Sequence, residues 1–207
     1  MNFTDLLGMG WEHILNFSSY DHILFIVVLC ALFKLNEWKK ILVIVTAFTI
    51  GHSVTLILSA LDLILIPAKV VEILIPLTIV FTAITNILQN KEQQQVKTFD
   101  RKLMKNYLLA MTFGFIHGMG FANTIKMMIG DEPTEMVKQL FAFNLGIELG
   151  QVMIVLCILI IYFILERIFR IRHREWNIFL SGAGFGVGGV LLISNILDYI
   201  AKNNYQS

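Results

Sequence analysis

Charged residues are scarce in this chain: Asp, Glu, Lys and Arg together make up 15% of its 207 residues. The formal net charge of +1 argues against nucleic acid as a partner, because binding phosphates requires a basic face. Cysteine is also rare. Cys30 and Cys157 lie in separate apolar runs, so the sequence contains neither a disulfide framework nor a CxxC-type thiolate metal site.

Lysine and arginine are absent from the first 17 residues, and no small-residue cleavage site is found there. A cleavable signal peptide is therefore not expected, because such a peptide has a basic segment ahead of its apolar stretch. The segment places Trp11 and Phe17 among polar residues. Aromatic side chains in such a setting are typical of the membrane interface, so we expect an interfacial or re-entrant segment here.

Apolar residues are abundant instead: 57% of the chain is hydrophobic, and its mean hydropathy is +0.73. Several apolar runs reach the ~20 residues that a helix needs to cross the hydrocarbon of a bilayer. The predicted spans are 18–34, 40–60, 66–88, 106–128, 139–165 and 176–198. We therefore predict an all-α membrane protein whose residues 1–207 form a single transmembrane domain of about six helices.

Basic residues fall mainly into three of the predicted loops. These loops contain Lys34, Lys39, Lys40, Lys91, Lys97, Arg101, Lys102, Lys105, Arg167, Arg170, Arg172 and Arg174, whereas the other side has only Lys69, Lys126, Lys138 and Lys202. Because cytoplasmic loops are enriched in Lys and Arg, this bias places both termini outside the cytoplasm. The longest cytoplasmic loop is then 89–105.

The last predicted span contains a GxGxxG pattern at Gly184, Gly186 and Gly189. A dinucleotide site is not expected, because no βαβ unit surrounds this pattern. Small residues in a membrane helix instead allow close approach of a neighbouring helix.

Polar and ionisable residues inside the predicted spans carry the functional information. They are Asp21, His22, His52, Glu72, His117, Asn144, Glu148 and Gln151. They come from five spans, and the topology places them in the outer half or near the middle of the bilayer. Helical spacing puts His52 and Ser53 on one polar face, and Asn144, Glu148 and Gln151 on another. Three glycines flank His117 and would admit a neighbouring backbone.

Interhelical hydrogen bonding alone is the simpler explanation for these residues. A carboxylate near the centre of a helix costs about 2.5–3.5 kcal/mol on insertion scales, whereas an interhelical hydrogen bond in a membrane returns about 0.6 kcal/mol. The free energy from hydrogen bonds does not offset the cost of placing the carboxylates of Asp21, Glu72 and Glu148 in the membrane. This cost is clearest for Glu148, which lies close to the middle of its span. Intramembrane ionisable residues therefore indicate a functional site.

Three neutral imidazoles with nearby carboxylates suit divalent Ni, Co, Zn or Fe, whereas copper(I) prefers sulfur. His22, His52, His117 and Asp21 are the predicted ligands. Asp21 or Glu72 would either bind the metal or fix a histidine tautomer. The remaining polar residues, Glu72, Glu148, Asn144, Gln151, Ser53 and His13, are assigned to support of the ligands or to proton relay.

Two further histidines lie outside the spans. His13 is either an entry ligand or an ordinary interfacial side chain, and the sequence favours neither. His173 stands among arginines in a predicted cytoplasmic loop, so a solvated charge cluster is expected there.

Several segments together resemble the HupE/UreJ family of membrane proteins. They are 10–15 (GWEHIL), 21–25 (DHILF), 46–56 (TAFTIGHSVTL), Glu72, 114–122 (GFIHGMGFA) and 143–151 (FNLGIELGQ). The resemblance covers most of the chain, and the last span matches only as a glycine-rich helix. It implies hydrogenase or urease accessory functions and uptake of nickel or cobalt. One departure is the short leader, because related members often carry a large extracytoplasmic domain there.

The leading hypothesis is a divalent-metal permease of a bacterial inner membrane. The alternative is a membrane-embedded zinc-type hydrolase of a lipid or lipidated peptide, with Glu148 or Asp21 as general base. A third is a non-catalytic subunit that delivers metal or stabilises a partner complex. Expected partners are membrane lipids and the metal ion, and further candidates are a second copy of the chain and maturation proteins of metalloenzymes.

Overall fold

The computed structural model describes residues 2–16, 20–64, 67–89, 101–128 and 133–204. These residues form helices and no strand. The helices are α1 (Phe3–Leu15), α2 (Tyr20–Ala31), the 3₁₀ turn η2 (Leu35–Glu37), α3 (Trp38–Ala60), α4 (Ala68–Gln89), α5 (Arg101–Met128), α6 (Pro133–Phe169) and α7 (His173–Asn204). The all-α prediction is confirmed.

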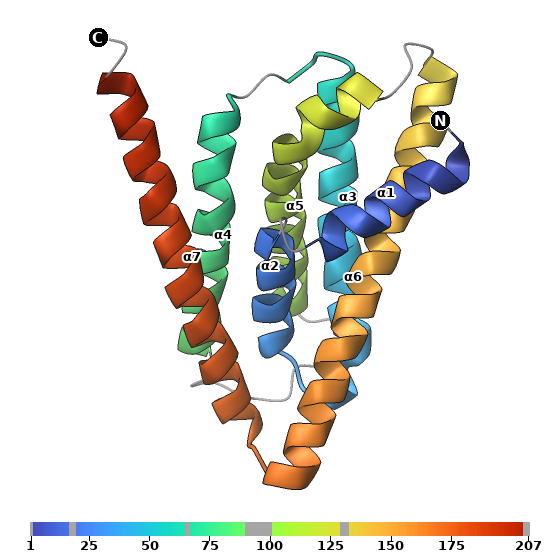
Figure 1. Cartoon of the computed structure of the whole chain (residues 1–207). Coiled ribbons are helices and arrows are strands. Elements are labelled where there is room, and N and C mark those ends of the chain that lie inside the picture. Colours follow the sequence, from blue (N-terminus) through green and yellow to red (C-terminus); the bar gives the residue numbers. More distant parts are fainter. Residues whose placement is uncertain (1, 17–19, 65–66, 90–100, 129–132, 205–207) are drawn as a thin grey trace.

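Within the described ranges, four helical segments are long and apolar enough to cross a membrane. They are Leu35–Ala60, Ala68–Gln89, Glu135–Phe169 and His173–Lys202. A fifth candidate is the pair formed by α1 and α2, which are bent by 68° relative to each other. α5 is not among these candidates, although it lies alongside α3 (Figure 1). The chain is thus an integral membrane protein with four to five candidate spans, and six crossings are not confirmed.

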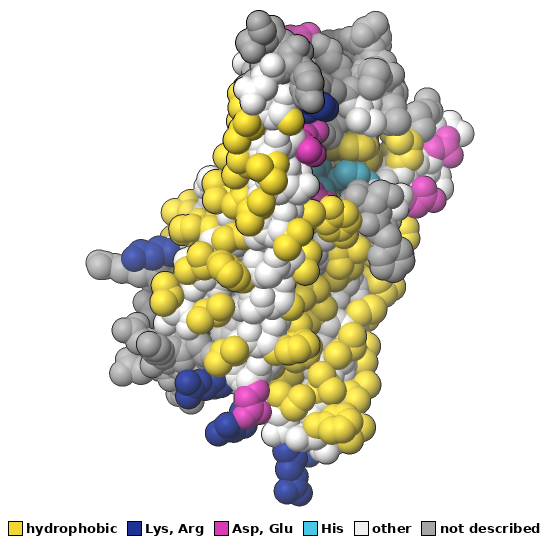
Figure 2. All heavy atoms as spheres, turned by 60° about the vertical axis from the view of Figure 1, so that its left-hand side comes forward, with side chains coloured by type: hydrophobic (Ala, Val, Ile, Leu, Met, Phe, Trp, Pro, Cys, Tyr) yellow, Lys and Arg dark blue, Asp and Glu magenta, His cyan; other side chains and the backbone are white. Residues whose placement is uncertain are grey.

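The predicted loop 89–105 lies mostly outside the described residues. The ends of α2, α4 and α6 lie together at one end of the bundle, whereas both chain termini lie toward the other (Figure 1). The loop-side residues Lys34, Lys39, Arg170 and Arg172 belong to the first of these ends, which we call the basic end. Figure 2 shows Lys and Arg side chains gathered near it.

α3 and α5 form the most extensive interface, and their backbones touch there (Figure 1). A Cβ atom built on Gly114 would lie 2.1 Å from the carbonyl oxygen of Phe48, and one on Gly51 would lie 2.1 Å from that of Met111. No other residue type fits at such a distance. The prediction that glycines beside His117 admit a neighbouring backbone is confirmed.

α1 packs across α6 in the same manner (Figure 1). A Cβ on Gly10 would lie 2.0 Å from the carbonyl oxygen of Phe143, and one on Gly146 would lie 2.1 Å from that of Leu7. These contacts fix the first helix, and with it His13, against the rest of the bundle.

α7 packs on α4 and α2. Its glycines divide into two groups: Gly184 and Gly188 face side chains of α2 and α4, whereas Gly182, Gly186 and Gly189 have no atom within 4 Å of a built Cβ. Only the first group therefore serves close approach within the chain.

A proline inside α4 links this helix to α7. Pro76 has no backbone N–H, so the carbonyl of Glu72, four residues earlier, loses its helical partner. The side-chain amide of Asn195 in α7 donates a hydrogen bond of 2.6 Å to that carbonyl. The carbonyl group that Pro76 leaves without a helical partner thus has one in α7.

Candidate metal centre

Four histidines from four helices gather between the crossing α1–α6 and α3–α5 pairs. His13 belongs to α1, His22 to α2, His52 to α3 and His117 to α5. The ring centroids of His13 and His22 are 5.0 Å apart, and those of His22 and His117 are 5.1 Å apart. The sequence thus placed these residues on different helices, and the fold brings them together.

Two overlapping groups in this cluster have the spacing of a metal site. The candidate ligand atoms of His13, His22 and His52 all lie within 4.8 Å of one another, as do those of Asp21, His22 and His117. A metal ion binds nitrogen ligands at about 2.0–2.1 Å, so atoms this close to one another are candidates to share one ion. His22 belongs to both groups.

The nitrogen atoms of the cluster fit a metal because several of them are buried and unpartnered. Among the described residues, no hydrogen-bond partner is found for Nε2 of His13, Nε2 of His22, both ring nitrogens of His52 or Nδ1 of His117. Buried polar atoms normally have a hydrogen-bond partner, and a buried polar atom that lacks one lowers the stability of the fold. A divalent metal ion would take one lone pair from each ring that it binds, whereas the protonated nitrogen of His52 would still need an acceptor.

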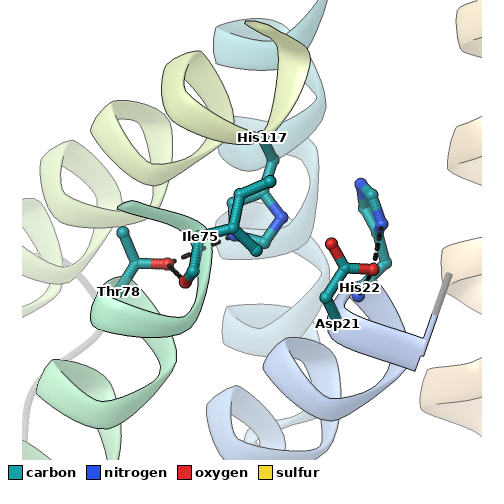
Figure 3. A network of polar contacts seen from close by, with 5 residues as sticks. All are labelled: Asp21, His22, Ile75, Thr78 and His117. Atoms are coloured by element: carbon teal, nitrogen blue, oxygen red, sulfur yellow. Dashed lines mark hydrogen bonds and ion pairs between the residues drawn. The ribbon is translucent and has the colours of Figure 1, made fainter. Parts of the chain in front are cut away.

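Asp21 sets the tautomer of His22. Its Oδ1 atom lies 3.1 Å from Nδ1 of His22 and accepts a backbone hydrogen bond from the same residue at 3.0 Å (Figure 3). A carboxylate only accepts, so it holds the proton on Nδ1 and leaves the lone pair on the unpartnered Nε2. This is the carboxylate–histidine arrangement of metal sites.

Thr78 of α4 sets the tautomer of His117, a role that no motif in the sequence indicates. Its hydroxyl donates to the carbonyl of Ile75 at 2.7 Å, and its oxygen lies 3.2 Å from Nε2 of His117 (Figure 3). Because the single hydroxyl proton is used, Thr78 accepts the proton of Nε2. The unpartnered Nδ1 of His117 then holds the lone pair and faces the side of Asp21 and His22.

Replacing Thr78 by valine is expected to weaken metal binding by about 10- to 100-fold, because loss of a supporting hydrogen bond frees the ring of His117. Thr78→Ser keeps the hydroxyl and is the matched control. Isothermal titration of both purified variants with Ni²⁺ measures the effect. Equal affinities of Thr78→Val and Thr78→Ser would show that the hydroxyl has no positioning role.

Aromatic rings enclose the cluster. The ring of Phe121 lies 4.2 Å from that of His13, and Phe121 stacks on Phe143 at 5.1 Å. Phe48 lies 5.1 Å from His117. Figure 2 nevertheless shows histidine side chains at the surface, beside acidic and hydrophobic side chains. His22, His52 and His117 are buried and His13 is half-buried, so the aromatic rings cover the cluster without closing it completely.

The residues predicted to support the metal ligands differ in what surrounds them in the fold. Asn144 neighbours His52, and its Oδ1 atom is buried without a partner among the described residues. Ser53 donates to the backbone carbonyl of Thr49 at 2.7 Å. Glu72 is exposed and belongs to neither metal-spaced group. Asn144 is thus the supporting residue placed against a candidate ligand.

Glu148 and Gln151 form a second polar region, between α3 and α6. Thr46 donates to Glu148 at 2.6 Å, and Thr49 donates to Gln151 at 2.7 Å. Neither residue belongs to the metal-spaced groups. Oε2 of Glu148 and Nε2 of Gln151 are buried and lack a partner among the described residues.

His173 lies at the basic end, where α7 begins. The hydroxyl of Tyr162 lies 3.3 Å from its Nδ1 atom, and its Nε2 atom is buried. The predicted solvated charge cluster fits the exposed Arg170 and Arg172, whereas His173 itself is half-buried beside Tyr162.

One family model, described as HupE / UreJ protein, matches residues 1–200 of the chain. The match spans the four cluster histidines and all of the helices that hold them. No curated protein and no solved structure matches.

Proposed function

Because this chain belongs to the HupE/UreJ family, we propose that it is a permease for a divalent transition-metal ion of the nickel and cobalt class, in a bacterial inner membrane. The observation that supports this most is the set of buried, unpartnered histidine nitrogens contributed by four helices. The ion is the cargo, and His13, His22, His52, His117 and Asp21 are its proposed ligands.

The ligands would take the place of the ion's water shell. Nitrogen donors suit Ni²⁺, Co²⁺ and Zn²⁺, and the sulfur that copper(I) prefers is absent from both metal-spaced groups. Asp21 supplies a negative charge beside His22. The second polar region around Glu148 lies outside these groups, and we assign it to charge balance or proton relay during transport.

Metal uptake into liposomes tests the proposal directly. Purified protein in proteoliposomes is expected to accumulate Ni²⁺ or Co²⁺ above the level of protein-free vesicles. The matched control is a His22→Ala sample reconstituted at the same protein density. Absence of flux for Ni²⁺, Co²⁺ and Zn²⁺ in the unaltered protein would overturn transport.

Metal binding is expected to weaken as the solution becomes more acidic. Imidazole binds a metal only in its neutral form, so protons compete with the ion at sufficiently low pH. The rings of His22, His52 and His117 are buried, and burial disfavours the charged imidazolium, so the affinity should change little between about pH 7.5 and about pH 5.5 and fall only in more acidic solution. Calorimetric titration with Ni²⁺ at several pH values measures the affinity; a fall of about tenfold or more already between about pH 7.5 and about pH 5.5 would show that the ligands are ordinary exposed imidazoles.

A membrane-embedded metallohydrolase is the second candidate, and the histidine side chains that reach the surface in Figure 2 favour it. A lipid or lipidated peptide would reach the cluster from that side, with Asp21 as the acid nearest to the histidines. Release of fatty acid or peptide fragments from zinc-loaded protein in lipid vesicles, lost in Asp21→Asn, would support this reading over transport.

A further inference from the structure

A cavity lies between the histidine cluster and the basic end of the bundle. It is narrow, with a volume of about 20 Å³ that has room for about one water molecule, and is bordered by α2, α3, α4 and α5. Its lining includes Phe33 near the end of α2, Gln89 at the end of α4 and Asn106 near the start of α5. These positions extend the cavity to the end of the bundle where the basic residues gather.

Aromatic rings separate this cavity from the candidate metal centre. Phe25 and Phe113 line the cavity and lie 5.9 Å apart. On the other side, the ring of Phe25 lies 5.4 Å from that of His117 and 5.0 Å from that of Phe48. Phe25 is 1% exposed. The histidine cluster and the cavity thus share one wall, built of phenylalanine.

A polar stripe on α4 runs past this wall. It begins at Thr78, the partner of His117, and continues through Thr82, Thr85 and Asn86 to Gln89, all four of which line the cavity. The stripe is about 16 Å long, since a helix rises 1.5 Å per residue. Oε1 of Gln89 is buried without a hydrogen-bond partner among the described residues. Polar side chains therefore follow α4 from Thr78 to the basic end, along a cavity whose surface is otherwise mostly apolar.

We propose that this cavity is the inner half of the ion's route and that Phe25 and Phe113 form its gate, which is closed in this structure. The proposal rests on the proposed transport function. A narrow apolar constriction closes a pore because water and ions do not enter it, so no charged side chain is needed to block the path. Displacement of the two rings would connect the cluster with the hydroxyl and amide oxygens of α4, which could replace part of the water shell of a departing cation.

Cysteine accessibility tests the gate. Single cysteines replace Thr78 or Gln89 in a Cys30→Ala, Cys157→Ser background, and a membrane-impermeant thiol reagent is added from the basic face of sealed vesicles. Lys39→Cys, at an exposed position of the basic end, verifies the sidedness. We expect labelling at Gln89→Cys and none at Thr78→Cys. Adding Phe25→Ala should raise the labelling rate at Thr78→Cys by about tenfold or more.

The controls separate gating from loss of structure. Phe163→Ala removes an exposed ring of α6 and should leave Thr78→Cys unlabelled. Phe113→Ala opens the same wall from α5 and should act as Phe25→Ala does. Ala142→Cys, buried in the core, reports unfolding and should stay protected in each variant.

Two results would overturn the gate: protection of Gln89→Cys from a reagent that labels Lys39→Cys, or labelling of Thr78→Cys that is unchanged by both phenylalanine replacements. The assay needs no metal, so its failure is distinct from failure of transport. Absent Ni²⁺ uptake together with the expected labelling pattern would overturn the permease and leave the aromatic barrier in place.

Discussion

Replacing His22 by alanine is expected to abolish high-affinity metal binding, with a loss of at least about 100-fold. The loss should be large because His22 is the one residue common to both metal-spaced groups. Its removal also leaves Asp21 without its ring partner. Titration of the purified variant with Ni²⁺ measures binding, and uptake into proteoliposomes measures transport.

His173→Ala is the matched control for this experiment. It removes an imidazole of the same size, at the basic end and away from the cluster, and should bind Ni²⁺ as the unaltered protein does. Equal loss of affinity in the two variants would point to a general effect on folding. Unchanged affinity in His22→Ala would show that the cluster is not the binding site.

Gly114→Ala should destabilise the protein and disrupt the site, although it adds a single methyl group. The new Cβ would lie 2.1 Å from the carbonyl oxygen of Phe48 and 3.0 Å from the backbone nitrogen of His52. α3 and α5 would have to separate, at a cost of about 1–3 kcal/mol or more. His52 and His117 lie on these helices, so metal binding should fall with stability. Thermal unfolding in detergent micelles and Ni²⁺ titration measure the two effects.

Gly186→Ala is expected to have the opposite effect on the stability of the protein. A Cβ at this position of α7 meets no atom within 4 Å. Alanine favours a helix over glycine by about 0.5–1 kcal/mol, so this variant should unfold at an equal or higher temperature. Similar destabilisation by both replacements would contradict the close backbone contact of α3 and α5.

The helical architecture and most of the histidine cluster could be predicted from the sequence. Apolar runs of membrane length predict helices because only helices and closed barrels satisfy the backbone in lipid. Histidines inside such runs are costly enough to indicate a site, which singled out His22, His52 and His117. The glycines around His117 predicted the close approach of another helix.

The remaining features depend on three-dimensional packing. His13 could not be assigned because it precedes the first apolar run, and only the bend between α1 and α2 carries it to the cluster. Thr78 resembles any other membrane threonine until the position of His117 is known. The depth of Glu148 within its apolar run predicts a place near the histidines, whereas its side chain accepts a hydrogen bond from Thr46.

The glycine contact between α3 and α5 also limits how the histidine cluster of this protein can be redesigned. Since main chain meets main chain at Gly51 and Gly114, no pair of side chains exists there whose sizes could be exchanged to widen or narrow the spacing of His52 and His117. Libraries that aim at a larger or smaller ion should vary Thr78 and Phe121, which border the cluster with replaceable side chains.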